Sequence, residues 1–161
     1  MWTTMSRVAL VLALAAGFAA MSGAAAADSG HVMVKPEELQ WKSVPSLPAG
    51  AQIAVLEGDL AKEEAFTMRV KFPANFIVPL HTHPTLERVT VLEGTLHLGI
   101  GETFEREKAE ALGEGALAIM DAGVPMYGFT GDQPTVIQVN GVGPWGIDYL
   151  NPEDDPRQKS N

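Results

Sequence analysis

The sequence predicts an all-β domain, either a sandwich or a barrel, on three observations. Residues 52–57 and 65–72 have strand patterns, and the second alternates apolar and polar side chains as a half-buried antiparallel strand does. A length of 161 residues is typical of one domain. Turns rich in Gly and Pro separate further short apolar runs, which lie at 89–92, 95–100, 116–120 and 135–140.

Residues 1–27 have the pattern of a secretory signal peptide. Arg7 supplies the positive charge, residues 8–20 are an apolar run, and Ala27 ends a small-residue cleavage pattern. A membrane anchor is the alternative, but the run is shorter than the roughly 20 residues that span a bilayer. No Cys is present to carry a lipid anchor. We therefore expect a periplasmic or secreted protein, cleaved after Ala27 and free of the membrane thereafter.

The acidic balance excludes some partners. The formal net charge is -9, and removal of residues 1–27 takes away only Arg7 among charged groups, which gives -10. Nucleic acid and anionic membrane surfaces are poor partners for such a chain. The acidity can equally serve solubility alone. The sequence contains no phosphate-binding loop, dinucleotide fingerprint, nucleophile elbow or Cys nucleophile.

The most informative stretch is 79–94, P-L-H-T-H-P-T-L-E-R-V-T-V-L-E-G. His81 and His83 are two residues apart on an expected strand, so both imidazoles point to one face. Pro84 ends that strand and Glu87 opens the next apolar run. A carboxylate then faces two imidazoles across neighbouring strands, which is a donor set for one metal ion. The alternative is that these are ordinary strand histidines and a surface carboxylate.

The spacing H-x-H-x(3)-E-x(6)-G resembles the first motif of the cupin superfamily, whose members are also called RmlC-like. The resemblance implies a single-domain jelly-roll β-barrel in which His81, His83 and Glu87 are metal ligands. It also implies a fourth ligand, usually His, from a second motif. That motif aligns with the stretch from Gly115 to Thr130 and puts Met126 at the ligand position.

The resemblance also divides the chain. It implies a cupin core at 65–142, preceded by an N-terminal arm and first strand at 28–64 and followed by a C-terminal tail at 143–161. Residues 104–112 have a helix-forming composition, so at most one short helix is expected, and a charged hairpin fits equally well.

The donor set leaves the metal open. Two imidazoles and one carboxylate suit Fe, and tolerate Mn or Zn, whereas a thioether at Met126 would favour Cu. Met126 can equally be an apolar filler of the barrel. We expect one metal ion per chain. The candidates for the pocket wall, each with core packing or solvent exposure as the alternative, are Met68, Phe76, His97, Tyr127, Gln138 and Asn140.

Two function classes follow. By resemblance, the chain is a small-molecule metalloenzyme of the dioxygenase, decarboxylase or isomerase type, an oxidoreductase or lyase, although no residue is identified as a catalytic base. The alternative is a non-catalytic cupin that binds a metal, copper among them, or a small ligand. A homodimer is also expected from the resemblance.

Overall fold

The computed structural model describes residues 30–158. The expected signal peptide at 1–27 lies outside them. The chain divides into two units, Met1–His31 and Val32–Asn161, and every described strand belongs to the second. Within the described residues there is no α-helix, and no helix long and apolar enough to cross a membrane. The second unit is built from two antiparallel β-sheets, as the sequence predicts.

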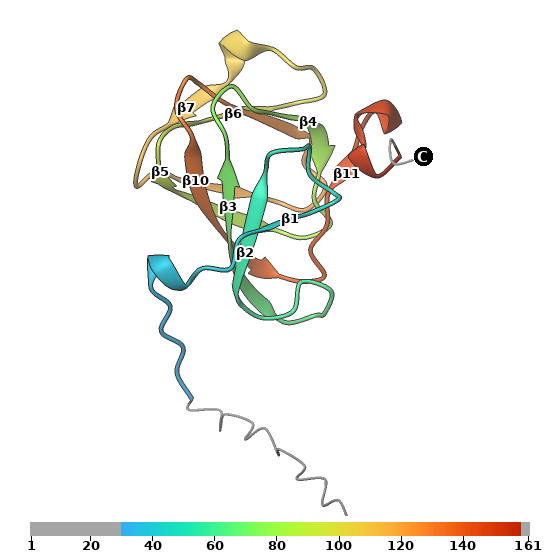
Figure 1. Ribbon diagram of the computed structural model, residues 1–161. Coiled ribbons are helices and arrows are strands. Elements are labelled where there is room, and N and C mark those ends of the chain that lie inside the picture. The colour runs from blue at the N-terminus through green and yellow to red at the C-terminus, as the bar shows by residue number, and fades with distance from the viewer. Residues whose placement is uncertain (1–29, 159–161) are drawn as a thin grey trace, which may run out of the picture. The chain divides into compact units, whose positions relative to one another are not determined.

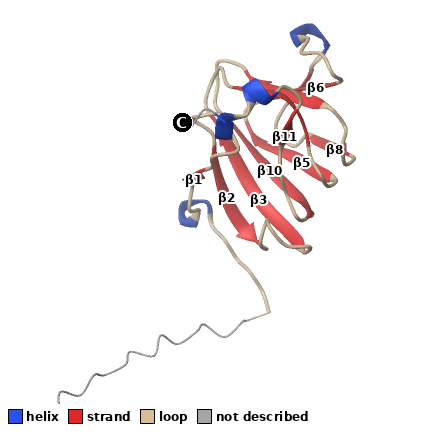
Figure 2. Ribbon diagram, turned by 90° about the vertical axis from the view of Figure 1, so that its right-hand side faces the viewer, coloured by secondary structure: helices blue, strands red, loops and turns tan. Residues whose placement is uncertain are grey.

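One sheet has six strands and begins in the N-terminal arm (Figure 2). Its central strands β3, β10 and β5 pair along most of their length. In spatial order the strands are β1 (Lys42–Ser43), β2 (Gln52–Glu57), β3 (Ala65–Phe72), β10 (Thr135–Val142), β5 (Glu87–Glu93) and β8 (Leu117–Met120).

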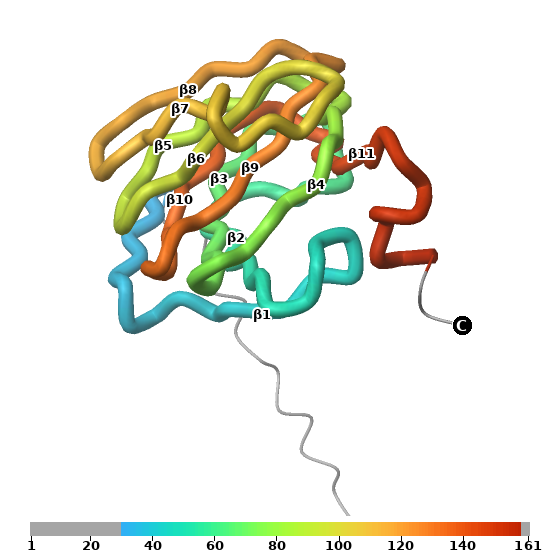
Figure 3. The backbone as a smooth tube through the Cα atoms, turned by 90° about the horizontal axis from the view of Figure 1, so that it is seen from above, coloured from blue at the N-terminus to red at the C-terminus, as the bar shows by residue number. Residues whose placement is uncertain are grey.

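The other sheet has five strands (Figure 3). In spatial order they are β11 (Asp148–Tyr149), β4 (Ile77–Thr82), β9 (Met126–Thr130), β6 (Leu96–Ile100) and β7 (Glu110–Leu112). Four single-turn 3-10 helices lie in the connections and near the ends of the described chain: η1 (Pro36–Glu38), η2 (Arg106–Lys108), η3 (Pro152–Asp154) and η4 (Pro156–Gln158). Figure 1 shows the labelled strands of both sheets in one unit.

The clearest predicted strands, 52–57 and 65–72, are confirmed as β2 and β3. The sequence did not predict β9, because all five of its residues are buried and no polar alternation marks it. Its outer side is covered by the connection between β6 and β7. There the Arg106 guanidinium lies 4.3 Å from the centre of the Phe129 ring. The stretch at 104–112 forms one 3-10 turn and the short strand β7.

The core lies between the two sheets. Alternate residues of β3 point inward, and Phe66, Met68 and Val70 are each at most 3 % exposed. They belong to one apolar cluster with side chains of the opposite sheet, among them Val78 and Leu96. Both sheets therefore contribute their inward-facing side chains, which alternate along each strand, to one core, as in a jelly-roll barrel.

Gly99 sets the spacing of β6 and β9. It pairs in register with Tyr127, whose ring lies over it where a side chain would otherwise be. The Tyr127 hydroxyl donates to the Glu105 carbonyl oxygen at 2.7 Å, and the residue is 1 % exposed. A Cβ at position 99 would overlap the ring.

We predict that Gly99→Ala lowers the free energy of unfolding by about 1–3 kcal/mol, because the buried ring must move. Gly113→Ala is the matched control, since a methyl group there meets open space. It should change stability by no more than about 0.5 kcal/mol. Urea unfolding of both variants measures this. Equal midpoints for the two variants would contradict this account of Gly99.

Candidate functional site

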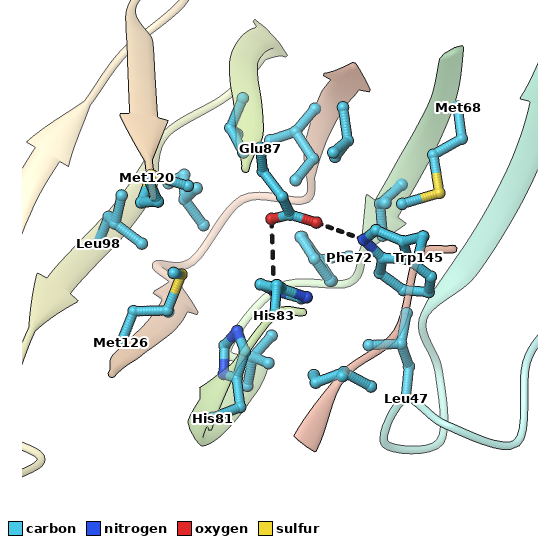
Figure 4. Close-up of a pocket in the computed structure, with 18 residues that line it drawn as sticks. Leu47, Met68, Phe72, His81, His83, Glu87, Leu98, Met120, Met126 and Trp145 are labelled. Atoms are coloured by element: carbon cyan, nitrogen blue, oxygen red, sulfur yellow. Dashed lines mark hydrogen bonds and ion pairs between the residues drawn. The ribbon is translucent and has the colours of Figure 1, made fainter. Parts of the chain in front are cut away.

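A cavity of about 70 Å³ lies between the two sheets. Inward-facing residues of β3, β4, β5, β6, β8, β9 and β10 line it, together with Leu47 from the N-terminal arm and with Trp145 and Ile147 after β10. Figure 4 shows His81, His83 and Glu87 grouped beside it. Among the described residues that line this cavity, these three are the only ionisable ones.

The two histidines come from the end of β4. His81 is the last residue but one of that strand, and His83 follows it directly before Pro84. They are 5 % and 6 % exposed, and their ring centres are 4.8 Å apart in an edge-on arrangement. The alternation of an extended chain brings both imidazoles to the same side.

Backbone carbonyl groups hold both rings. The Nδ1 atom of His81 is 2.6 Å from the Pro79 oxygen, and that of His83 is 2.6 Å from the Gly146 oxygen. A carbonyl oxygen only accepts hydrogen bonds, so each Nδ1 must carry the hydrogen and donate it. In the neutral ring, Nε2 is then the atom with the free lone pair. This is the arrangement that prepares a histidine to bind a metal ion.

Glu87, the first residue of β5, is 4 % exposed. Its Oε1 accepts the indole N–H of Trp145, and its Oε2 lies 3.3 Å from Nε2 of His83. Because Nδ1 of His83 holds one hydrogen already, a neutral His83 would bring a lone pair against a carboxylate oxygen. Only a cation between the two atoms, either a proton or a metal ion, makes that contact favourable.

Burial shifts the pKa values of His81 and Glu87. It lowers the pKa of His81 to about 4, with the neighbouring His83 adding to the effect and the hydrogen bond to Pro79 opposing it. Burial raises the pKa of Glu87, while His83 and the Trp145 hydrogen bond act against that rise. Without a bound cation, burial therefore favours the uncharged forms of His81 and Glu87.

Met126 lies beside His81. The two residues pair across β4 and β9, and Met126 is 2 % exposed and lines the cavity. In Figure 4 its side chain lies in the cavity wall next to the two histidines. A thioether is thus available next to the imidazoles, although the same burial is also what an apolar filler would have.

The expected pocket wall needs correction. Met68 lines the cavity, but His97, Tyr127, Gln138 and Asn140 do not. Successive residues of a strand point to opposite faces of its sheet. These four point away from the cavity, because their neighbours point into it, namely Leu96, Leu98, Met126, Gly128, Ile137 and Val139. In β10, the polar side chains of Gln138 and Asn140 therefore lie on the face turned away from the apolar cavity wall.

The displaced candidates make contacts elsewhere. His97 stacks on Phe129, with ring centres 4.6 Å apart. Asn140 donates to the Thr67 hydroxyl at 2.8 Å and accepts from Gln138 at 3.4 Å. Phe76 is buried in the core against Phe72, with ring centres 5.3 Å apart, but it does not line the cavity.

Trp145 was not predicted from the sequence. Besides its bond to Glu87, its ring stacks on His83 with centres 5.7 Å apart, and the next residue, Gly146, provides the carbonyl that holds His83. The only signal was a Trp in a Gly-Pro-Trp-Gly run, which no spacing rule connects to a histidine 62 positions earlier.

The described part of the chain contains no group of three or more His, Cys, Asp or Glu side chains placed to hold a metal ion. The donor types nevertheless fit one: two imidazoles with free Nε2 lone pairs, and a carboxylate oxygen that needs a cation. To bind it, the side chains would have to move toward a common centre.

Solved structures share this architecture. The chain is similar to the polyketide cyclase RemF from Streptomyces resistomycificus, with 19 % identity, a TM-score of 0.63, and coverage of 78 % of this chain and 89 % of that one. An RmlC-like cupin from Shewanella frigidimarina NCIMB 400 matches at 13 % identity and a TM-score of 0.55, over 68 % and 87 %. This chain has the cupin fold.

The DMSP lyase DddQ from Ruegeria pomeroyi DSS-3 is another cupin-fold match, at 22 % identity and a TM-score of 0.59, over 71 % of this chain and 62 % of that one. No family model and no curated protein sequence matches the chain. The cupin jelly roll predicted from the motif at 79–94 is confirmed. Structural neighbours with this fold include enzymes.

From the burial of His81 we predict that stability depends on pH in protein freed of metal by a chelator. Unfolded His81 takes up a proton near its ordinary pKa of 6.5, whereas folded His81 stays neutral down to about pH 4. The unfolded state therefore binds more protons in this window, and stability falls as pH drops through it. His81→Asn, whose amide can still donate to Pro79, should remove this contribution.

The difference in unfolding free energy between wild type and His81→Asn should change by on the order of 3 kcal/mol from pH 7 to pH 4, in favour of the variant at low pH. Denaturant unfolding at a series of pH values measures it. The opposite contribution of Glu87 is common to both proteins and cancels. A difference that stays constant with pH would disprove a buried neutral His81.

Proposed function

We propose that this chain is a periplasmic metal-binding cupin in which His81, His83 and Glu87 hold one metal ion, and that it acts on a small molecule as a metalloenzyme of the dioxygenase, decarboxylase or isomerase type. One observation carries the proposal. Both imidazoles donate Nδ1–H to backbone carbonyls, and the free Nε2 of His83 meets a carboxylate oxygen at 3.3 Å inside a closed fold. Such a pair requires a cation.

A metal ion bound there would supply Lewis-acid chemistry, and a redox-active ion would add electron transfer. The chain itself supplies orientation and exclusion of water. The Trp145 indole holds one oxygen of Glu87, which leaves Oε2 for the ion. The apolar wall keeps the dielectric low, which strengthens every charge interaction in the cavity. No other carboxylate lines the cavity in the described residues, so a proton acceptor would have to come from this same set or from the substrate.

Met126 supports a second candidate, a cupin that binds copper without turnover. Its register opposite His81 and its place in the cavity wall put a soft sulfur beside two imidazoles. Thioether and imidazole ligands suit Cu(I), while hard divalent ions bind a thioether poorly.

The proposal also includes export and homodimer formation, which are supported by features outside the metal site. Export rests on the signal-peptide pattern of residues 1–27. Homodimer formation would have a surface at β8, a terminal strand of the six-stranded sheet that exposes Leu117 and Ile119.

Metal binding is the direct test. Chelator-treated protein dialysed against Fe(II), Mn(II), Zn(II) or, under reducing conditions, Cu(I) should retain one ion per chain by elemental analysis. His83→Asn and Glu87→Gln should each weaken retention at least tenfold, since each removes a ligand. His97→Asn and Glu102→Gln are the matched controls, because His97 lies outside the cavity and Glu102 is exposed.

Met126→Leu separates the two candidates. If sulfur is a ligand, the variant loses Cu(I) affinity and keeps that for Zn(II), whereas a filler role leaves both unchanged. Oxygen consumption or substrate turnover by the loaded protein favours the enzyme. Failure of the wild type to retain any of the four ions at micromolar concentration would refute the proposed metal site.

A further inference from the structure

The polar groups of the cavity wall are few and lie together, and the rest of the wall is apolar. His81, His83, Glu87 and the Trp145 indole are its polar groups, and Figure 4 shows them gathered together. Every other described lining residue is apolar or Gly. No Lys, Arg, Asn, Gln, Ser, Thr or Tyr side chain of the described chain lines it.

The polar groups also lack a spare hydrogen-bond donor in the neutral site. The Nδ1–H groups of the two histidines are given to Pro79 and Gly146, and the Trp145 indole N–H is given to Glu87. What is left to a ligand is acceptors, first of them the Nε2 lone pair of His81, since both Glu87 oxygens already contact Trp145 and His83.

A carboxylate ligand would therefore be poorly accommodated. A buried anion needs a cation or several donors for its oxygen atoms, and its desolvation otherwise costs several kcal/mol. Here a bound metal ion would be the sole partner of such a ligand, and any oxygen turned away from it would face the apolar side chains of the wall. A cationic ligand meets the same wall, and Glu87 is already engaged by His83 and Trp145.

We propose that the cavity binds a small, uncharged, largely apolar organic molecule, with its one polar atom turned toward His81, His83 and Glu87. This inference rests on the function proposed above, since it names the ligand class of the same site. The cavity of about 70 Å³ limits the size. It is about half of the ~150 Å³ that holds benzene, so it suits a molecule of roughly three or four non-hydrogen atoms.

Propan-2-ol and acetate are a matched probe pair, because they have the same number of non-hydrogen atoms and nearly the same shape and differ in charge. The alcohol can also donate its hydrogen to the Nε2 lone pair of His81. The indole N–H resonance of Trp145, assigned by its loss in Trp145→Phe and observed by nitrogen–proton NMR, reports on binding inside the cavity. We expect saturable shifts with propan-2-ol at millimolar concentration and at least tenfold weaker binding of acetate, in metal-free protein. Equal or tighter binding of acetate, or no saturable shift with propan-2-ol, would overturn the proposal.

Gly128→Ala locates the binding. Its added methyl group enters the cavity wall at ordinary contact distance, 3.5 Å from Leu96 Cδ1, so it takes up space without strain. It should weaken propan-2-ol binding severalfold, while Gly113→Ala, in open space, should leave it unchanged. Thermal unfolding checks that both variants are folded, and equal binding by the two would place the alcohol outside the cavity and overturn the proposal.

Running the probes on metal-free protein separates the two hypotheses. If propan-2-ol binds but no ion is retained, the ligand class stands and the metal function fails. If an ion is retained but acetate is preferred in the metal-free and the loaded protein alike, the metal function stands and the ligand class fails.

Discussion

Two buried hydrogen-bond acceptors cannot sit against one another without a cation between them, and the site is organised around such a contact. The Gly146 carbonyl takes the Nδ1–H of His83, which turns the lone pair of a neutral ring toward Oε2 of Glu87 at 3.3 Å. Leaving a buried acceptor unsatisfied costs about 1–3 kcal/mol, and more for a charged one. A proton can fill this position, and so can a metal ion. The geometry thus links protonation and metal binding at one pair of atoms.

The arrangement depends on chain segments far apart in sequence. The motif at the end of β4 and the start of β5 supplies the ligand set, but the residues that orient it lie after β10. Trp145 and Gly146 hold Glu87 and His83, and Arg157 ties the chain beyond them back by donating to the Ile147 carbonyl at 3.0 Å. From the other side, the Tyr149 hydroxyl donates to the Ser46 carbonyl at 2.8 Å, next to Leu47 in the cavity wall. The segments before β2 and after β10 therefore complete the site.

Local patterns predicted what depends on local geometry. The alternation in β3 and the two-residue spacing of His81 and His83 follow from the extended chain alone, so that strand and the shared side of the two rings were predictable. The wall was not, because polar side chains do not mark a cavity that is apolar: Gln138 and Asn140 face out while Ile137 and Val139 face in. Trp145 and the doubly covered strand β9 depend on contacts across the fold, which no short pattern encodes.

At this site both rings carry their hydrogen on Nδ1 and present Nε2 to the cavity. Nitrogen NMR of uniformly labelled, metal-free protein at neutral pH measures the tautomer of each histidine directly, with His81→Asn and His83→Asn to assign the signals. We predict the Nδ1–H form for His81, and for His83 a protonated Nδ1 with Nε2 shared with Glu87 or free. Nε2–H tautomers with unprotonated Nδ1 atoms would contradict it.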